Sequence, residues 1–213
     1  MVDRPKPRRY DSPRRSRQAA ATRTEILEAA LRLFEQRGYT ATTMAAIAAE
    51  AGVALKTVYL AFQTKRGLLL ALWHLRLRGD ERPMPVGERP WFREVIDERD
   101  PARLLRLNAR NSRVVNERAG PLLEILRNAA SADIELAALW KRIRTEFYDN
   151  QHAIVERLRA NNALRPGLEV DHGADILWAL NHPDLYRLLV GDRGWTPERY
   201  EEWLGDAFCA QLL

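Results

Sequence analysis

The sequence predicts an all-α protein of two parts, and three observations carry this prediction. Apolar residues recur every three or four positions through most of the 213 residues, which is the spacing of amphipathic helices. An apolar share of 46% and a charged share of 30% are typical of a globular protein. Residues 1–80 hold 15 Lys and Arg against 7 Asp and Glu, a net charge of +8, whereas residues 81–213 carry −3. This asymmetry favours a domain for a polyanion joined to a domain with another task, although a merely soluble basic protein would look similar.

Composition also limits where the protein works. The single cysteine, Cys209, excludes an internal disulfide and fits a reducing compartment. No stretch approaches the ~18 uninterrupted apolar residues of a membrane span. Residues 1–16 are rich in arginine but lack the apolar block of a secretory signal. We therefore expect a cytoplasmic protein with no membrane partner.

The first 21 residues differ from the rest of the chain because basic residues alternate there with prolines. This composition cannot build a core and predicts a flexible basic arm over residues 1–21. The arm has two interpretations: a solvated tail, or a segment that adds phosphate or minor-groove contacts to a nucleic acid. Three arginines next to the first predicted helix would make those contacts: Arg14, Arg15 and Arg17.

The first helix is predicted to begin at Thr22, which has the spacing of a capping box with Glu25. Behind it, Ile26, Ala30 and Phe34 follow helical spacing until Gly38, where we expect the helix to stop.

Two short helices with a tight turn between them follow. Thr43 can cap the first, Gly52 supplies the turn, and the second covers residues 55–62. Ala48 is small enough to lie where the helices cross, and Val58 fills the space between them. Such a pair predicts a helix-turn-helix, with plain core architecture as the alternative.

The residues of this region resemble the N-terminal domain of TetR-family transcriptional regulators over about residues 22–75. The positions that carry the resemblance are Gly38, Tyr39, Thr42, Thr43, Met44, Ile47, Ala48, Ala51, Gly52, Val53, Thr57, Val58, Tyr59, Phe62, Lys65, Leu68 and Leu69. The resemblance implies that residues 55–61 form a recognition helix. It also implies a homodimer whose two recognition helices enter successive major grooves of double-stranded operator DNA with a pseudo-palindromic sequence.

Single residues take DNA-binding roles from this resemblance. Thr43 would bind a phosphate at a helix N-terminus, Thr57 and Tyr59 would touch the DNA backbone or a thymine methyl, and Lys65 would bind a phosphate. Lys56 could reach a guanine edge or a phosphate. Apolar or small residues stand where many relatives carry base-reading side chains, so base readout is expected to be sparse: Met44, Leu55, Leu60 and Ala61.

The remaining residues predict further helices. We expect a fourth helix over 64–79, a boundary over 79–90 rich in Pro, Gly and charge, and helices over 101–117, 121–130, 133–161, 171–181 and 196–212. In domain terms, residues 22–66 are the DNA-binding domain and residues 67–213 the helical effector-binding and dimerisation domain.

Within the second domain, Asn108 and Asn111 lie on a partly apolar helix face, where buried amides need partners. A small-molecule effector is one such partner, and core or surface positions are the alternative. Four residues of the long helix at 133–161 would line the same pocket, unless they are ordinary core: Trp140, Phe147, Tyr148 and His152.

The C-terminal pattern also resembles this family, through Trp178-Ala179-Leu180, Gly194-Trp195-Thr196-Pro197 and Tyr200, Trp203 and Leu204. In the family two helices pair with their symmetry mates into a four-helix bundle, which here implies the helices near 171–181 and 196–212. The dimer interface predicted here consists of Ile176, Leu177, Leu180, Tyr200, Trp203, Leu204 and Phe208. An intramolecular core built from the same residues is the alternative.

Catalytic and metal-binding motifs are not found: the four histidines lack metal-ligand spacing, and no phosphate loop or nucleophile motif occurs. We expect no enzyme activity, metal or cofactor. The sequence predicts a homodimeric regulator, in this family usually a repressor, which an unidentified small-molecule effector releases from its operator. An architectural DNA-binding protein without an effector and an activator of the same fold are the alternatives.

Overall fold

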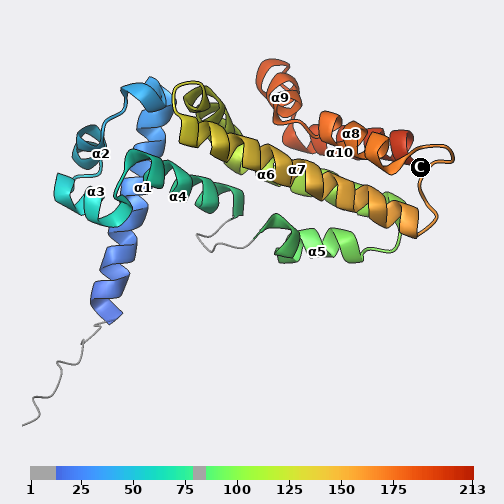
Figure 1. The fold of residues 1–213 in the computed structure, drawn as a ribbon, viewed down its shortest axis with the longest axis horizontal. Helices are drawn as coiled ribbons and strands as arrows, with labels where there is room; N and C mark the ends of the chain where they lie inside the picture. Colours follow the sequence, from blue (N-terminus) through green and yellow to red (C-terminus); the bar gives the residue numbers. More distant parts are fainter. Residues whose placement is uncertain (1–12, 79–84) are drawn as a thin grey trace, which may run out of the picture. The chain divides into compact units, whose positions relative to one another are not determined.

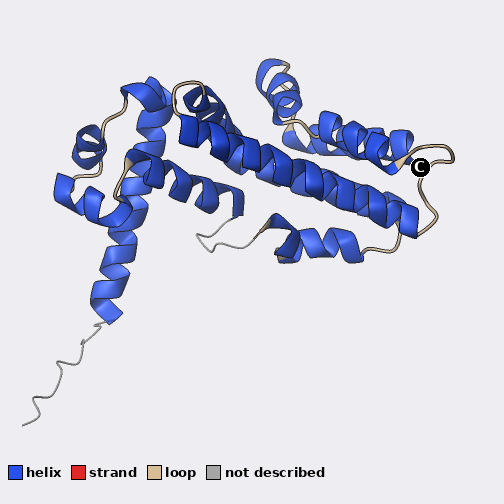
Figure 2. Cartoon of the chain, in the orientation of Figure 1, coloured by secondary structure: helices blue, strands red, loops and turns tan. Residues whose placement is uncertain are grey.

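The computed structural model describes residues 13–78 and 85–213, and over these ranges it consists of helices and turns with no strand (Figure 2). The all-α prediction is confirmed. The chain divides after Ala71 into two compact units, called here the N-terminal unit and the C-terminal unit. The division falls inside helix α4 (Lys65–Arg78), so this one helix belongs to both units. The predicted boundary at residue 66 lies five residues earlier.

The N-terminal unit contains α1 (Pro13–Ala41), α2 (Met44–Glu50) and α3 (Leu55–Phe62), followed by the start of α4 (Figure 1). Helix α2 packs against both α1 and α3. The core of the N-terminal unit consists of fully buried apolar side chains from α1, α2 and α3, among them Ile26, Phe34, Ile47 and Val58. The predicted helix-turn-helix is therefore present.

The beginning of α1 differs from the prediction. The helix starts at Pro13, nine residues before the expected cap at Thr22, so the capping box lies inside a continuous helix. Two features explain this: residues 18–21 are Gln and Ala, which favour helix, and a proline suits the first turn of a helix. Residues 13–21 are thus not a flexible arm, and residues 1–12 lie outside the described part of the chain.

The loop between α1 and α2 follows the prediction closely. The backbone leaves helical geometry at Gly38, with a φ of 76° that favours glycine. Thr43 caps α2, because its hydroxyl oxygen accepts a hydrogen bond from the Ala46 N–H at 3.1 Å. Thr42 is 1% exposed and its hydroxyl lies within hydrogen-bond distance of the Leu33 and Gly38 carbonyls, at 3.2 and 2.8 Å.

The C-terminal unit is built around two long antiparallel helices, α6 (Pro101–Ala130) and α7 (Ile134–Ala160), which lie side by side (Figure 1). Helix α10 (Pro197–Leu212) packs on α6, and α8 (Val170–Leu180) packs on α7. Helix α5 (Pro90–Asp97) contacts both long helices. Shorter segments complete the unit: η1 (Val86–Glu88), α9 (Pro183–Tyr186) and a π-helical turn η2 (Arg187–Asp192).

Helix α6 corrects a second expectation, because the predicted helices 101–117 and 121–130 are one helix with Pro121 inside it. Proline removes one backbone hydrogen bond and usually bends or ends a helix. Here the residues on either side of it, including Ala119, Leu122 and Leu126, are buried. The apolar area that they bury outweighs the lost hydrogen bond, so the helix continues.

Among the described residues, no single helix is both long and apolar enough to cross a bilayer. Helices α2 and α3 reach that length and composition only when taken together, and they are bent by 112° at the turn between them.

Candidate functional site

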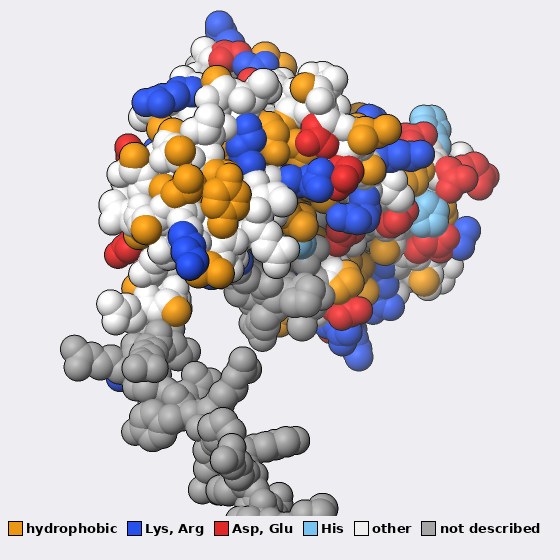
Figure 3. Space-filling view, turned by 60° about the vertical axis from the view of Figure 1, so that its left-hand side comes forward, with side chains coloured by type: hydrophobic (Ala, Val, Ile, Leu, Met, Phe, Trp, Pro, Cys, Tyr) orange, Lys and Arg blue, Asp and Glu red, His pale blue; other side chains and the backbone are white. Residues whose placement is uncertain are grey.

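Helix α3 presents an exposed side, called here the α3 outer face, made of Leu55, Lys56, Tyr59 and Leu60. These positions follow helical spacing, and Val58 and Phe62 point the other way into the core. Leu60 is 76% exposed, an unusual state for a leucine, and Leu55 and Tyr59 are also exposed. Exposed hydrophobic side chains stand among basic ones on this unit in Figure 3. The α3 outer face is thus a mainly apolar surface with a single cation.

Two further residues with predicted phosphate or backbone contacts are Thr43, at the start of α2, and Thr57, on α3. Thr43 is exposed at the start of α2, where free N–H groups collect, although its hydroxyl oxygen already accepts the Ala46 N–H. Thr57 is half-buried, and with Leu60 and Ala61 it forms one wall of an open groove whose other wall is the first part of α1.

Met44 does not belong to this surface. Its side chain is only 7% exposed and packs into the core of the N-terminal unit, so the prediction that it contacts DNA is wrong. Met44 is the first residue of α2, and at this position the side chain points inward beneath the cap formed by Thr43.

Lys65 lies in the first turn of α4, as expected, and its ammonium binds backbone carbonyls of the same chain. Its Nζ atom donates to the carbonyl oxygens of Tyr39, Thr40 and Thr42 at 2.7, 3.3 and 2.8 Å. An ammonium has three N–H donors, so all three are engaged by the backbone. Burial lowers the pKa of Lys65 from its ordinary value. In this structure Lys65 stabilises the α1–α2 loop, and its contact with a DNA phosphate stays a prediction.

Arg23 is a stabilising residue that the sequence did not reveal. Its Nη1 atom donates to the Ala61 carbonyl at 2.8 Å, and its guanidinium stacks 4.2 Å from the centre of the Phe62 ring. A cation is favourable at the C-terminus of a helix, where unpaired carbonyls gather. Arg23 thus fixes the end of α3 against α1.

The junction between α3 and α4 is unusually tight. The Thr64 N–H donates to the Phe62 carbonyl at 2.6 Å, with Gln63 between them at φ 60° and ψ −48°. This is a γ-turn of the rare, strained kind. A Cβ atom on Gly67 would lie 2.5 Å from the same Phe62 oxygen. The orientation of α3 relative to α4 therefore depends on a glycine at position 67.

The C-terminal unit encloses a cavity of about 120 Å³ between α4, α5, α6, α7 and α8. Six of its lining residues are Trp or Phe, and four of the six tryptophans in the chain take part. The aromatic lining residues are Trp73, Trp91, Phe92, Trp140, Phe147 and Trp178. Apolar concave sites with a few polar groups are typical of small-molecule binding.

Polar groups on α6 and α7 interrupt this aromatic lining. The Asn108 Nδ2 atom donates to Gln151 Oε1 at 3.2 Å, and both residues are buried. Asn111 donates to the backbone oxygen of Trp91 at 3.0 Å. Ser112 donates to the Asn108 carbonyl one turn earlier at 2.7 Å. The two asparagines expected from the sequence thus line the cavity, each held by a partner within the protein.

Of the four residues expected from the long helix, two line the cavity and two do not. Trp140 and Phe147 line it, seven residues apart on one face of α7. At 3.6 residues per turn, His152 is rotated about 120° from Trp140. His152 instead lies with its Nε2 atom 3.1 Å from Asp171 Oδ1, and Tyr148 packs against the hydrophobic core. The assignment of Tyr148 and His152 to the pocket is corrected.

The sequence interpretation missed several lining residues. Ser112 and Asn116 follow Asn108 at intervals of four, so helical spacing could have found them. Gln151 follows Phe147 by the same interval. Trp91, Trp178 and Asn181 belong to helices that meet only in the folded chain, and no local pattern marks them.

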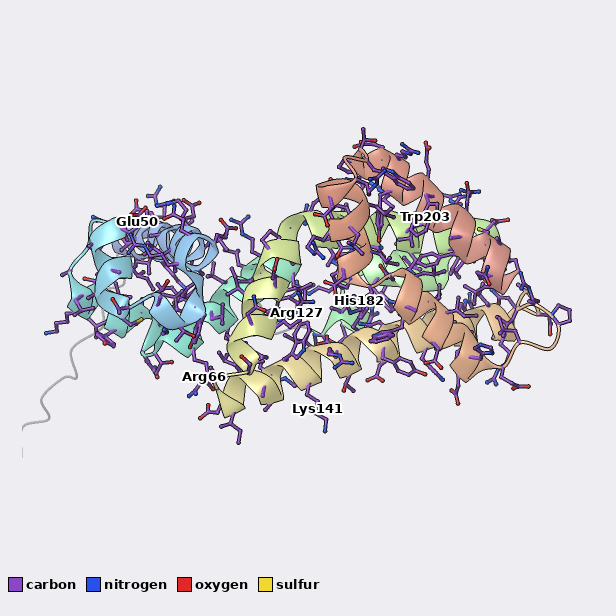
Figure 4. All side chains as sticks on the ribbon, turned by 90° about the horizontal axis from the view of Figure 1, so that it is seen from above. Glu50, Arg66, Arg127, Lys141, His182 and Trp203 are labelled. Atoms are coloured by element: carbon purple, nitrogen blue, oxygen red, sulfur yellow. The ribbon has the colours of Figure 1, made fainter. Side chains whose placement is uncertain are left out.

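The predicted dimer surface is corrected in part. Leu177, Tyr200, Leu204 and Phe208 are 0% exposed within the single chain, where they form the core between α6, α8 and α10. They cannot contact a partner, so the intramolecular alternative holds for these four. The other three predicted residues are half-buried: Ile176, Leu180 and Trp203, of which Trp203 is labelled on α10 in Figure 4.

The N-terminal unit contains a helix-turn-helix whose second helix, α3, has an exposed face. Helix α4 continues from it into a helical unit with a cavity. This combination is typical of the two-domain helix-turn-helix regulators. The sequence profile for bacterial regulatory proteins of the tetR family matches residues 26–72. This match covers less than a quarter of the chain and identifies residues 26–72 as a domain of the tetR type. The resemblance drawn from the sequence over about residues 22–75 is thereby confirmed.

Two relatives of known sequence agree. The HTH-type transcriptional regulator AcrR of Shigella flexneri is 29% identical over 145 residues, which cover 67% of this chain and 65% of that protein. The chain thus spans slightly less than two thirds of AcrR. An uncharacterized HTH-type regulator of Mycobacterium tuberculosis is 27% identical over 194 residues, covering 89% of this chain and 87% of the relative.

Solved structures share the fold at low sequence identity. The complex of SmeT with triclosan has a TM-score of 0.68 at 23% identity and covers 91% of this chain and 92% of SmeT. NalD, the secondary repressor of the MexAB-OprM multidrug efflux pump in Pseudomonas aeruginosa, has a TM-score of 0.66 at 23% identity, with coverages of 92% and 98%. These similarities confirm the fold.

Proposed function

We propose that this chain is a TetR-family regulator that binds a pseudo-palindromic operator as a homodimer and represses transcription until a small molecule occupies the C-terminal cavity. The α3 outer face would enter the major groove, where Lys56 reaches a base edge or a phosphate and Tyr59 the backbone. Leu55 and Leu60 suit the methyl groups of thymines. The partly exposed side of α8 and α10, with Ile176, Leu180 and Trp203, is the candidate surface for the second subunit.

The observation that carries this proposal is that α4 contributes residues both to the helix-turn-helix unit and to the lining of the cavity. At its first residue, Lys65 holds the carbonyls of the α1–α2 loop within the N-terminal unit. Two or three turns later, Trp73 and Leu77 line the cavity of the C-terminal unit. A molecule in the cavity would touch α4 directly, and a helix transmits displacement along its axis.

A small molecule can release DNA only if it binds the non-DNA-binding conformation more tightly, since equal affinity for both conformations shifts nothing. In this proposal the occupied cavity displaces Trp73 and Leu77, α4 turns, and the two recognition helices no longer match the half-site spacing. Two similar proteins support repression and small-molecule binding as parts of this proposal. NalD is named as a repressor, and SmeT forms a complex with triclosan.

The test begins with selection of bound sequences from random DNA by the full-length protein, followed by measurement of operator affinity and of the number of chains per site. Compounds that raise the melting temperature are then tested for release of that operator. We expect an inverted repeat bound by an even number of chains, and a compound that lowers operator affinity. Enrichment of no sequence would contradict the proposal.

Two variants on α4 separate coupling from general damage. Leu77→Ala removes a side chain that lines the cavity, whereas Leu75→Ala removes an equally half-buried side chain of the same helix outside that lining. The releasing compound should lose its effect on operator affinity in Leu77→Ala and keep it in Leu75→Ala. Equal responses in the two variants would refute transmission through α4.

A further inference from the structure

We infer that the cavity of the C-terminal unit is built for a neutral, single-ring aromatic molecule that carries one hydroxyl or carbonyl group. This inference deepens the proposed function, because it names the chemical class of molecule for that same cavity. It rests on three features of the lining: its size, two carboxamides without partners, and the placement of its charges.

The size of the cavity suits one aromatic ring. Its volume of about 120 Å³ is of the same order as the roughly 150 Å³ apolar cavity that accommodates benzene in an engineered protein. Trp140 and Phe147 on α7 and Trp178 on α8 supply broad aromatic surfaces, which pack against rings in stacked or edge-to-face arrangements. A larger molecule would have to extend into the open groove that continues from the cavity.

Two buried carboxamides on the lining lack intramolecular partners. Asn116 on α6 and Asn181 at the end of α8 are each 4% exposed. Among the described residues, neither side chain makes a hydrogen bond, in contrast to Asn108 and Asn111 on the same lining. Their carboxamide atoms are not among the fully buried side-chain atoms that lack a partner, so these atoms keep access to open space, and both residues line the cavity. The missing partner is supplied if a bound molecule brings a hydroxyl or carbonyl group.

The position of Asn116 also orients the molecule. This residue lines both the cavity and an adjoining open groove of about 460 Å³ between α6 and α9, and Trp140 and His182 are shared in the same way. Figure 4 labels His182 after α8 and Arg127 on α6, two residues that line this groove. The ring therefore lies among the tryptophans, and its polar substituent points toward Asn116 and the groove.

The charges around the cavity favour a neutral molecule. Arg144 is exposed, with its guanidinium 5.8 Å from the centre of the Trp178 ring. Glu146 is half-buried and accepts the Val86 N–H at 2.9 Å. The ring of His182, also on the lining, has its Nδ1 atom 3.3 Å from the Asp184 nitrogen. A buried anion or cation needs a buried opposite charge. Arg144 and Glu146 have opposite signs and neither is fully buried. The lining therefore favours neither an anion nor a cation.

The experiment compares five probes of similar size by isothermal titration calorimetry on the full-length protein. p-Cresol and benzamide are neutral with one hydrogen-bonding group, ethylbenzene has none, benzoate is an anion and benzyltrimethylammonium is a cation. We expect p-cresol or benzamide to bind at least about tenfold more tightly than the other three, because a site with unpaired polar groups rejects analogues that cannot pair with them. Tightest binding of ethylbenzene or of either ion would overturn the inference, as would binding of none of the five.

Variants of the carboxamides give a second readout. Asn116→Leu should weaken the tighter neutral probe about tenfold, because it removes the amide that pairs with the polar group of the probe. Asn128→Leu, at an exposed position of the same helix, should leave probe affinity unchanged. Asn181→Leu repeats the test if Asn116→Leu does not fold. A lower melting temperature with unchanged probe affinity would show that Asn116 is a structural residue.

Operator affinity distinguishes this inference from the proposed function. If a neutral probe binds through Asn116 but operator affinity does not change, the ligand class is right and release by the cavity is wrong. If no probe binds while a compound of another class releases the operator, the proposed function stands and the ligand class is overturned.

Discussion

The Nζ atom of Lys65 lies 2.7 Å from the backbone oxygen of Tyr39 and 4.3 Å from the centre of the Tyr39 ring. One ammonium thus binds the carbonyls at the end of α1 and stacks on an aromatic ring beside them. A lysine that resembles a phosphate ligand in sequence is thus engaged by the protein itself and shapes the helix-turn-helix.

Lys65→Met should lower the free energy of unfolding by about 1–3 kcal/mol, because it removes three hydrogen bonds to a charged group. Urea unfolding measures this change. Lys56→Met, at an exposed position of α3, is the matched control and should change stability by less than about 0.5 kcal/mol. Unchanged stability in Lys65→Met together with weaker DNA binding would favour the phosphate role.

Lys56→Met should weaken DNA binding and make it less sensitive to salt. Each phosphate contact that is lost reduces the slope of log affinity against log salt by about one unit per subunit. Fluorescence anisotropy over a salt series measures the slope. Lys141→Met removes an equally exposed lysine on the outer side of α7 (Figure 4), and its slope should match the unmodified protein. Equal slopes in all three proteins would mean that Lys56 makes no phosphate contact.

Gly67→Ala should destabilise the N-terminal unit by about 1–3 kcal/mol, because the new Cβ would lie 2.5 Å from the Phe62 oxygen and force the α3–α4 junction to shift. Gly191→Ala is the control, since the position is exposed and its Cβ would meet only the Arg187 side chain at 3.8 Å, an ordinary contact. The melting temperature should fall in Gly67→Ala and stay unchanged or rise in Gly191→Ala. A tolerated Gly67→Ala would contradict the described junction.

Tyr200→Phe should stabilise the protein by about 1 kcal/mol, because the Tyr200 hydroxyl is buried without a hydrogen-bond partner among the described residues. Burial also raises the pKa of Tyr200 above its ordinary value. Above about pH 10 only the unfolded chain ionises this group, so stability is lost as the pH rises. Denaturation between pH 7 and 11 should show a smaller loss in Tyr200→Phe. An identical pH dependence would mean that the hydroxyl is accessible.

The sequence predicted the features that depend on local chemistry. Thr43 caps a helix, Gly52 has a positive φ of 66° in the turn, and Val58 is fully buried, all as expected from spacing alone. The error at Thr22 arose because a capping pattern can occur within a helix when the residues before it also favour helix. The error at Pro121 arose because packing on both sides outweighed one lost hydrogen bond.

The cavity and the dimer surface were predicted less well because they depend on contacts between distant helices. An aromatic stripe has the same spacing whether it faces a cavity, the core or a second subunit. Phe208 therefore looked like an interface residue and is core, and Tyr148 looked like a lining residue and packs against the core. Trp178 joins the cavity only because α8 packs on α7.

The central claim is that α3 lies in the major groove of two half-sites bound by one dimer. Its most direct test attaches a DNA-cleaving iron chelate to a cysteine at position 56, in a protein whose only native cysteine has been replaced (Cys209→Ser). The account predicts two clusters of cleavage on the selected operator, separated by about one helical turn or a multiple of it. Cleavage spread evenly along the DNA, or one cluster alone, would contradict it.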